Sequence, residues 1–464
     1  MNGFQTNSFK LFDLAGITSY HIIMSAKTVP ELALFPLTTE VSKQSHLCIG
    51  GCDVVDLAEE FGTPLYVFDE YTLRHKCREF GEEFGGCYPE TVVIYACKAF
   101  LNRALALIFK EEGLGLDVVS GGELSIAHSV DLPLDKVYFH GNNKTPEELN
   151  LALDWGVGRI VVDNFYELEL LNKLTKERGT TQSILLRLTP GVDPHTHQYT
   201  TTGTIESKFG FPLATGQAEE AVNRALLASN LNLLGLHFHL GSPVSELQPY
   251  ELAIELVLRF AREVGRKFSF SPSEFDIGGG FAVPYTLDSV VPTIADYART
   301  VSGKLNSLIL ELGLSRPRLI IEPGRAIVAQ AGVALYKVGA IKEIQGIKKY
   351  VCVDGGMSDN VRPALYRARY EALVANEAVK KAREVVTIAG KLCESGDILA
   401  KDVNLASVHP GGIIAIPVCG AYSIPMSSNY NAMPKPAIVM VKKGRARLIR
   451  RRETYEDLMR LDLM

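Results

Sequence analysis

The chain has 464 residues, of which 47% are hydrophobic and 22% charged, with 40 Gly and 22 Pro. This balance is typical of a globular protein and excludes disorder, a collagen-like repeat and a coiled coil. The 48 Lys and Arg residues are nearly matched by 53 Asp and Glu residues. The resulting net charge of −5 offers no broad attraction for nucleic acid or for an anionic membrane.

The number of cysteines and the hydropathy pattern indicate the cellular compartment of the protein. Eight cysteines in a chain of this length are too sparse for a disulfide framework, so we expect reduced thiols. Cys48 and Cys52 lie near His46, but no second pair stands at zinc spacing and we expect no metal. No apolar run reaches the roughly 18 residues of a membrane span, and no secretory signal is visible. We therefore expect a cytoplasmic protein.

The first part of the chain is irregular in pattern up to about residue 47, and we interpret the first 33 or so residues as an extension of unknown role. A short amphipathic helix is predicted over Val54–Phe61, followed by a strand over Pro64–Phe68 and a helix over Tyr71–Phe84. Residues 1–69 are assigned to this extension and to a segment that joins a later β domain.

Short apolar segments then alternate with helical stretches. Such an alternation predicts parallel strands with crossover helices, and about 250 residues of it favours a (β/α)₈ TIM barrel over an open doubly wound sheet. The barrel is assigned to residues 70–327. The eight predicted strands are Val92–Ala96, Leu116–Val119, Val137–His140, Ile160–Val162, Ile184–Leu188, Leu233–His239, Glu274–Ile277 and Arg318–Ile321. The predicted helices are Leu101–Glu112, Glu123–His128, Pro146–Trp155, Tyr166–Arg178, Pro249–Val264 and Thr293–Leu312, with a polar loop over Thr189–Thr204.

The pattern changes after Arg325, where strands are separated by Gly, Pro and Asn turns and only one helix, over Arg369–Arg383, is predicted. A C-terminal β-rich domain, a sandwich or barrel, is therefore assigned to residues 328–464. Its predicted strands are Val333–Glu343, Lys349–Val353, Val385–Ala389, Ile413–Cys419, Ala437–Lys442 and Ala446–Ile449.

Unusual residues follow several of the predicted barrel strands, at the face where barrels carry their chemistry. Lys98 follows one strand; a surface lysine is the common interpretation, but partial burial would lower its pKa and make it a Schiff-base nucleophile. His239 ends another strand on the same face as His237, and a hydrogen-bonded structural histidine is equally compatible with either position.

Two glycine-containing turns indicate an anion site. Gly278–Gly280 follow an apolar strand, where glycines either form a tight turn or let the backbone approach a phosphate. The last strand ends in Glu322-Pro323-Gly324-Arg325. In the simplest case Glu322 and Arg325 would form an ion pair with each other. Alternatively, the acid would bind the ring nitrogen of a phosphorylated pyridine cofactor and the arginine would bind its phosphate. Farther on, Cys393 lies beside Glu394 in a polar turn, which favours an exposed, reactive thiol.

Taken together, an ordered set of motifs resembles the diaminopimelate decarboxylase family of fold-type III pyridoxal-phosphate enzymes, which have alanine-racemase-like barrels. The resemblance covers about residues 35–435. The motifs are Tyr95-Ala96-Cys97-Lys98-Ala99, residues 113–123 with Asp117 and Glu123, His140-Gly141-Asn142-Asn143-Lys144, His237-Phe238-His239-Leu240-Gly241-Ser242, Glu322-Pro323-Gly324-Arg325, residues 354–359, and Cys393-Glu394-Ser395-Gly396-Asp397.

The resemblance implies a role for each matching residue. Lys98 is expected to form the Schiff base with pyridoxal 5′-phosphate, His239 to stack on its ring, and Glu322 to bind its pyridine nitrogen. The other expected cofactor-binding residues are Asp117, Ser242, Gly278, Gly279, Gly280, Pro323, Gly324, Arg325 and Tyr422, with Glu123 near the Schiff base. The expected substrate-binding residues are Arg325, Arg362, Tyr366, Glu394 and Tyr422.

Cys393 matches the general acid that protonates the substrate carbon after CO₂ leaves. In the family this thiol and its neighbouring glutamate come from the partner subunit, so the resemblance implies a homodimer with shared active sites. The expected reaction is decarboxylation of meso-2,6-diaminopimelate to L-lysine.

Three other functions compete with this expectation. A relative on the same scaffold would act on ornithine, lysine, arginine or a carrier-bound amino acid; Arg362 with Tyr366 favours a substrate with a distal carboxylate instead. A non-catalytic barrel that buffers pyridoxal phosphate would need Lys98 but not Cys393 or a second domain. An inert structural barrel would be colourless when purified.

Overall fold

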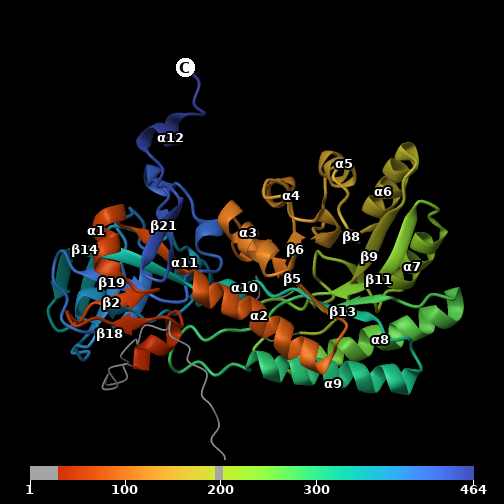
Figure 1. The fold of residues 1–464 in the computed structure, drawn as a ribbon, viewed down its shortest axis with the longest axis horizontal. Helices are drawn as coiled ribbons and strands as arrows, with labels where there is room; N and C mark the ends of the chain where they lie inside the picture. The colour runs from red at the N-terminus through yellow and green to blue at the C-terminus, as the bar shows by residue number, and fades with distance from the viewer. Residues whose placement is uncertain (1–29, 194–201) are drawn as a thin grey trace, which may run out of the picture.

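The computed structural model describes residues 30–193 and 202–464, in which a parallel β-barrel stands beside a β-rich region (Figure 1). The predicted N-terminal extension lies almost wholly outside the described residues, as does the middle of the predicted loop between Thr189 and Thr204. At the other end, the C-terminal segment extends away from the body of the molecule (Figure 1).

The barrel predicted from the sequence is confirmed. Eight parallel strands pair in chain order, and Leu319 of the last strand is in register with Thr91 of the first, which closes the ring. Because helices cover the outside and side chains fill the inside, the strands are buried on both faces. They are β5 (Thr91–Ala96), β6 (Gly115–Val118), β7 (Val137–Phe139), β8 (Arg159–Val162), β9 (Gln182–Thr189), β11 (Leu231–Phe238), β12 (Glu274–Asp276) and β13 (Arg318–Ile321), with the short β10 (Phe211–Pro212) beside β9.

Helices surround the barrel, and along one side α9 packs against both α2 and α8 (Figure 1). Helix α7 was not predicted from the sequence; its N-cap is Gly216, which has no side chain to form a cap, so the usual start signal is absent. The helices are α2 (Glu70–Cys87), α3 (Arg103–Glu111), α4 (Gly121–His128), α5 (Pro146–Asp154), α6 (Phe165–Arg178), α7 (Gln217–Leu227), α8 (Gln248–Phe268), α9 (Ile294–Leu312) and α10 (Arg325–Val328).

Side-chain caps fix where several of these helices begin after their strands. Asp69 accepts from the amide of Thr72, Asn102 from that of Leu105 and Ser120 from that of Glu123. Each such cap contributes about 1 kcal/mol to stability. The caps hold the short loops between strand and helix in place, and these loops carry the residues at the barrel mouth.

The β-rich region is built around β14 (Gly332–Ile344), which pairs with β4 (Leu65–Asp69), β15 and β19. Because β4 precedes the barrel in the sequence, the chain enters and leaves the barrel through the same sheet. The remaining elements are β1 (Glu40–Val41), β2 (Leu47–Ile49), β3 (Cys52–Asp53), α1 (Val54–Phe61), β15 (Lys348–Val353), α11 (Arg362–Tyr366), β16 (Leu373–Val374), β17 (Glu384–Ala389), β18 (Ile398–Leu405), β19 (Ile413–Ile416), β20 (Ala437–Lys442), β21 (Arg445–Arg450) and α12 (Tyr455–Met459).

The helix predicted over Arg369–Arg383 is wrong. Leu373 and Val374 instead form β16, which pairs with Ala415 and Ile414 of β19, and a single 3₁₀ turn follows. The pairing buries both side chains, so tertiary contacts override the helical pattern. The helix of this region is α11, which begins at Arg362.

The barrel and the β-rich region share one apolar core. Tyr66 and Phe68 of β4 belong to the same buried cluster as Tyr95 and Phe100 of the barrel, and the Phe68 and Phe100 ring centroids lie 5.2 Å apart. The amide of Tyr422 also donates to the carbonyl of Ala99, at 2.8 Å. The β-rich region is thereby fixed against the barrel mouth, next to Lys98.

The buried carboxyl of Asp359 predicts a pH dependence of stability. Burial raises its pKa from 3.8 to about 7, with Asp354 and Asp397 adding to the effect. The unfolded chain loses this proton near pH 4 while the folded chain keeps it, so the free energy of unfolding falls as pH rises to about 7. We expect Asp359→Asn to remove this contribution, measured as urea midpoints at fixed chain concentration from pH 4 to 8. Exposed Asp56→Asn is the control, and parallel curves for Asp359→Asn and the wild type would contradict the prediction.

None of the helices in the described ranges combines the length and apolar character needed to cross a bilayer.

Candidate active site

The carboxyl-terminal mouth of the barrel opens into a cavity of about 900 Å³. Lys98 and His239 reach it from the ends of β5 and β11, while Arg362 reaches it from α11 of the β-rich region. The sequence-predicted residues that line it are Lys98, His239, Ser242, Arg325, Arg362, Tyr366 and Tyr422. The cavity therefore lies between the barrel and the β-rich region and uses side chains from both.

Lys98 lies in the short turn after β5, with its side chain 36% exposed. Its Nζ donates to Oδ2 of Asp117, at 3.2 Å, because Asp117 of β6 is in register with Ala96. Burial disfavours the ammonium, but Asp117 and Glu322 outweigh it and raise the pKa of Lys98. The expectation that burial lowers this pKa is therefore wrong: neighbouring carboxylates hold Lys98 as an ammonium.

Glu322 lies deeper, after β13, and is 2% exposed. Its Oε1 is 3.0 Å from Nε2 of His140 and 3.5 Å from Nε2 of His237. Burial raises the pKa of Glu322, but the two imidazoles more than offset this and hold it well below its usual range. Among the described residues Glu322 makes no ion pair with Arg325, so the simple pairing of these two residues is excluded.

The turn after Glu322 packs tightly against β5. The carbonyl of Pro323 accepts from the amide of Ala96, at 3.2 Å. A Cβ at Gly324 would lie 3.0 Å from the Cβ of Ala96, which explains why a glycine stands there. Ala96 precedes Lys98 by two residues, so this contact places the turn after Glu322 close to Lys98.

His239 packs on the glycine turn. Its Nδ1 accepts from the amide of Gly279, at 3.2 Å, and burial together with Lys98 holds its pKa well below its usual range. The ring is thus neutral and carries its proton on Nε2. A Cβ at Gly278 would lie 2.7 Å from the same Nδ1, and one at Gly279 would lie 2.1 Å from the carbonyl oxygen of Glu322. The glycines thus allow β11, β12 and β13 to converge at the mouth.

Arg325 forms a cluster of hydrogen-bonded polar side chains in the wall of the cavity. Its Nε donates to Oγ of Ser242, at 3.2 Å, and its Nη1 to the hydroxyl of Tyr285, at 2.7 Å. The guanidinium also lies over the ring of Tyr422, 4.7 Å from the ring centroid. A cation and two hydroxyls therefore lie together in the wall of the cavity, an arrangement that suits an anion; Gly278, Gly279 and Gly280 are not among the residues that line it.

Arg362 is only 6% exposed. Its Nη1 donates to the hydroxyl of Tyr370, at 2.5 Å, and its guanidinium lies 4.5 Å from the centroid of the Tyr285 ring. Tyr366, at the other end of α11, also lines the cavity. Aromatic rings therefore cover the faces of the guanidinium, and its charge is shielded from bulk water.

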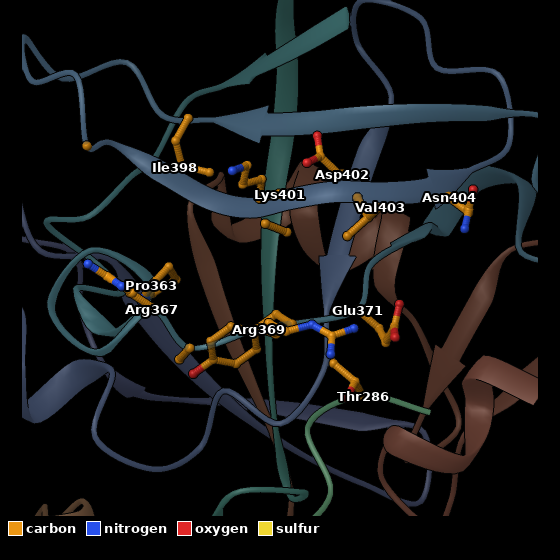
Figure 2. Close-up of a pocket in the computed structure, with 14 residues that line it drawn as sticks. Thr286, Pro363, Arg367, Arg369, Glu371, Ile398, Lys401, Asp402, Val403 and Asn404 are labelled. Carbon is orange, nitrogen blue, oxygen red and sulfur yellow. The ribbon is translucent and has the colours of Figure 1, made fainter. Parts of the chain in front are cut away.

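Cys393 and Glu394 do not line the cavity of their own chain. Both side chains are exposed, in a turn anchored by Asp397, which accepts from the amides of Met357 and Leu392 at 2.6 and 2.8 Å. A second cavity, of about 490 Å³, is lined by Gly396 of this turn and by Pro363, Arg367 and Glu371 (Figure 2). It shares with the larger cavity a wall that includes Arg369 and is lined on its other side by β18.

Sequence reasoning assigned no role to three residues at the site. Arg187 interrupts the apolar run of β9, lines the cavity, and lies 4.3 Å from the centroid of the Phe209 ring. A lone arginine inside a barrel strand was the available signal. His140 stood in a recognised motif, whereas Tyr285 follows the glycine turn in an irregular loop that gives no signal.

Comparison with known proteins identifies the family. Residues 71–329 match the family model described as pyridoxal-dependent decarboxylase, pyridoxal binding domain. The chain is 45% identical to diaminopimelate decarboxylase of Bacillus subtilis over 426 residues, which cover 92% of this chain and 97% of that protein. It is 42% identical to the enzyme of Synechocystis, with 95% of each chain covered.

Solved structures agree. The crystal structure of diaminopimelate decarboxylase from M. jannaschii in complex with L-lysine superposes with a TM-score of 0.87 at 38% identity, covering 92% of this chain and 98% of that one. A lysine/ornithine decarboxylase from Vibrio vulnificus has a TM-score of 0.71 at 22% identity, which shows the fold alone. The chain belongs to the pyridoxal-dependent decarboxylases and, within them, to the diaminopimelate decarboxylase family.

Proposed function

We propose that this protein decarboxylates meso-2,6-diaminopimelate to L-lysine, with pyridoxal 5′-phosphate as cofactor. The main observation in support is that two functional groups line the same cavity. One is the amine of Lys98, just after a barrel strand, and the other is the buried guanidinium of Arg362, from the β-rich region. The relatives at 42–45% identity support the reaction.

The residues present fit this cofactor. Oδ1 of Asp117, Oδ2 of Asp276 and Oε1 of Glu322 are buried without a hydrogen-bond partner among the described residues, as are both ring nitrogens of His237. Buried polar atoms without partners are rare outside functional sites. Lys98 would hold the cofactor covalently, Glu322 would bind the ring nitrogen, and Arg325, Ser242 and the glycine turn would bind the phosphate.

When bound, the cofactor supplies an electron-accepting ring that stabilises the electron pair left by departing CO₂. The side chains of the protein orient the cofactor and set where protons and charges lie around it. His239 is neutral and packs against the ring site, Glu322 keeps a negative charge for the ring nitrogen, and Asp117 holds the proton of Lys98 Nζ. Tyr422, whose amide is bound to Ala99, closes the cavity near Lys98.

The substrate has an amino-acid group at each end, so the distal end needs a cation and an anion. Arg362, with Tyr366, would bind the distal carboxylate. Glu394 would bind the distal ammonium, and Sγ of Cys393 would donate the proton that replaces CO₂ on the α-carbon.

Because Cys393 and Glu394 are exposed and do not line their own cavity, we assign both to the cavity of a second copy. The proposed assembly is a homodimer with two shared sites. A cytoplasmic location stays a prediction from the sequence.

Replacing Arg362 tests substrate recognition. We expect Arg362→Met to lower kcat/KM for meso-diaminopimelate by about 100-fold or more, because a charge-assisted hydrogen bond to the distal carboxylate is lost. Cofactor affinity, measured by titrating the apoenzyme, is expected to stay within about twofold of wild type. Exposed Arg383→Met is the matched control.

The same assay separates the alternative substrates. Ornithine and lysine lack a distal carboxylate, so the wild type is expected to release little CO₂ from either. Efficient release from ornithine or lysine, or an Arg362→Met chain that keeps wild-type kcat/KM, would refute this substrate assignment.

A further inference from the structure

A buried cluster of histidines and acids lies beneath the active-site cavity. We define the histidine–acid cluster as Asp117, His140, His237 and Glu322. Every member is at most 3% exposed. Four strands of the barrel contribute them: Asp117 lies on β6, His140 follows the neighbouring β7, His237 lies on β11 and Glu322 follows β13.

His140 connects the two acids. Its Nε2 lies 3.0 Å from Oε1 of Glu322 and 3.8 Å from Oδ1 of Asp117. Asp117 in turn accepts from Nζ of Lys98 through its other oxygen. The cluster therefore links the lysine at the mouth to the acid beneath the ring site.

His237 approaches Glu322 from the other side. Its Nε2 lies 3.5 Å from the same Oε1, and its ring centroid is 4.9 Å from that of His140 at an interplanar angle of 71°. His237 is in register with Asp276, the neighbouring acid on β12. Two imidazole nitrogens thus lie within 3.5 Å of one carboxylate oxygen, and that oxygen has no hydrogen bond of good geometry among the described residues.

A buried carboxylate stays ionised only when nearby groups stabilise the charge. Burial lowers the pKa of His237 to about 3, so this ring is neutral and offers an N–H dipole. Asp276 has a raised pKa, from burial and then from the Glu322 charge, so it is a neutral acid. Asp117 contributes no positive charge, and the cations Lys98 and Arg187 make no hydrogen bond or ion pair with Glu322 among the described residues. The protonated carboxyl of Asp276 also faces Glu322, and the two imidazoles are the groups that lower the pKa of Glu322 and so favour its ionised form.

We propose that His140 and His237 are positioning residues that hold the Glu322 carboxylate ionised and oriented toward the ring nitrogen of the cofactor. This inference rests on the proposed function and deepens it. Neither histidine needs to touch the substrate, because both act through Glu322. If they only filled space, any side chain of similar size and polarity would serve.

A pair of amide substitutions distinguishes these roles. The amide nitrogen of His237→Gln reaches about the place of Nε2, whereas that of His237→Asn reaches only about the place of Nδ1 and falls short of Glu322. Both changes are polar and uncharged. The same pair is made at His140, and exposed His75→Gln on α2 is the control.

The direct readout is the ¹⁵N chemical shift of the ring nitrogen in enzyme loaded with ¹⁵N-labelled pyridoxal phosphate. Wild type and the two Gln variants are expected to show a protonated ring nitrogen, whereas the Asn variants shift toward the unprotonated value. In the Asn variants we expect kcat to fall by about 10- to 100-fold, by analogy with residues that orient metal ligands, with KM within about twofold.

Equal ¹⁵N shifts and equal kcat in the Asn and Gln variants would overturn the inference. So would an Asn variant that raises KM and leaves kcat unchanged. Failure of the proposed function has a different signature, since the wild type itself would then release no CO₂ from meso-diaminopimelate. If an Asn variant does not fold, His237→Phe replaces it in the comparison with His237→Gln.

Discussion

Lys98→Ala is expected to abolish decarboxylation, with a loss of about 10⁴-fold or more in kcat/KM. The reason is that Lys98 is the one lysine among the described residues that line the cavity, and nucleophile loss has effects of this size. The measurement is CO₂ release, together with the mass of the chain after borohydride reduction of the loaded enzyme. Wild type is expected to gain the mass of the reduced cofactor at Lys98, and the variant to gain none.

Exposed Lys136→Ala is the matched control and should keep both properties. If Lys98→Ala retained turnover, or if borohydride fixed the cofactor at another lysine, the assignment of the cofactor site would be wrong. The borohydride measurement also tests the inert-barrel alternative, because an inert barrel would gain no cofactor mass even as the wild type.

Cys393→Ala is expected to slow turnover by about 10²- to 10⁴-fold while leaving the cofactor bound, since loss of a general acid typically has this effect. The cofactor should stay because its expected contacts, Lys98, His239, Arg325 and the glycine turn, do not involve the turn at Cys393. Absorbance of the bound cofactor reports its retention, and the steady-state rate of lysine formation reports turnover. A variant with full turnover would show that another group donates the proton.

Mixing the two inactive chains tests whether Cys393 serves the partner's cavity. In a heterodimer of Lys98→Ala with Cys393→Ala, one site has both substitutions and the other has neither. Random pairing of equal amounts is therefore expected to restore about a quarter of wild-type activity per chain. No recovery after verified subunit exchange would contradict the shared site, and full activity of either chain alone would contradict the roles themselves.

Much of the fold followed from local patterns. The eight barrel strands are runs of apolar residues, which parallel strands need because they are buried on both faces, and all eight lie within a few residues of their predicted bounds. Where a local signal was absent or misleading, the prediction failed. Helix α7 has no side-chain cap, and Leu373 with Val374 pairs with β19 although the surrounding sequence has a helical pattern.

The site divides in the same way. The positions of Lys98, His239, Glu322 and Arg325 near the barrel mouth followed from the sequence because each comes at or just after the end of a strand, whereas their roles stay predictions. Arg187 and Tyr285 were not assigned, since one lies within a strand and the other in an irregular loop. The raised pKa of Lys98 was also missed because Asp117 and Glu322 meet it only through strand register and the closure of β13 on β5.

The sequence by itself determined the barrel, the residue types at its mouth and the family to which they belong, because periodicity and motif order are local properties of the chain. Only the tertiary structure decided that β4 joins the C-terminal sheet, that Arg362 enters the cavity from that region, and that His140 and His237 meet at Glu322. It also decided that Cys393 and Glu394 lie outside their own cavity. Distances between residues far apart in the chain depend on how strands close and pack, and no local pattern encodes them.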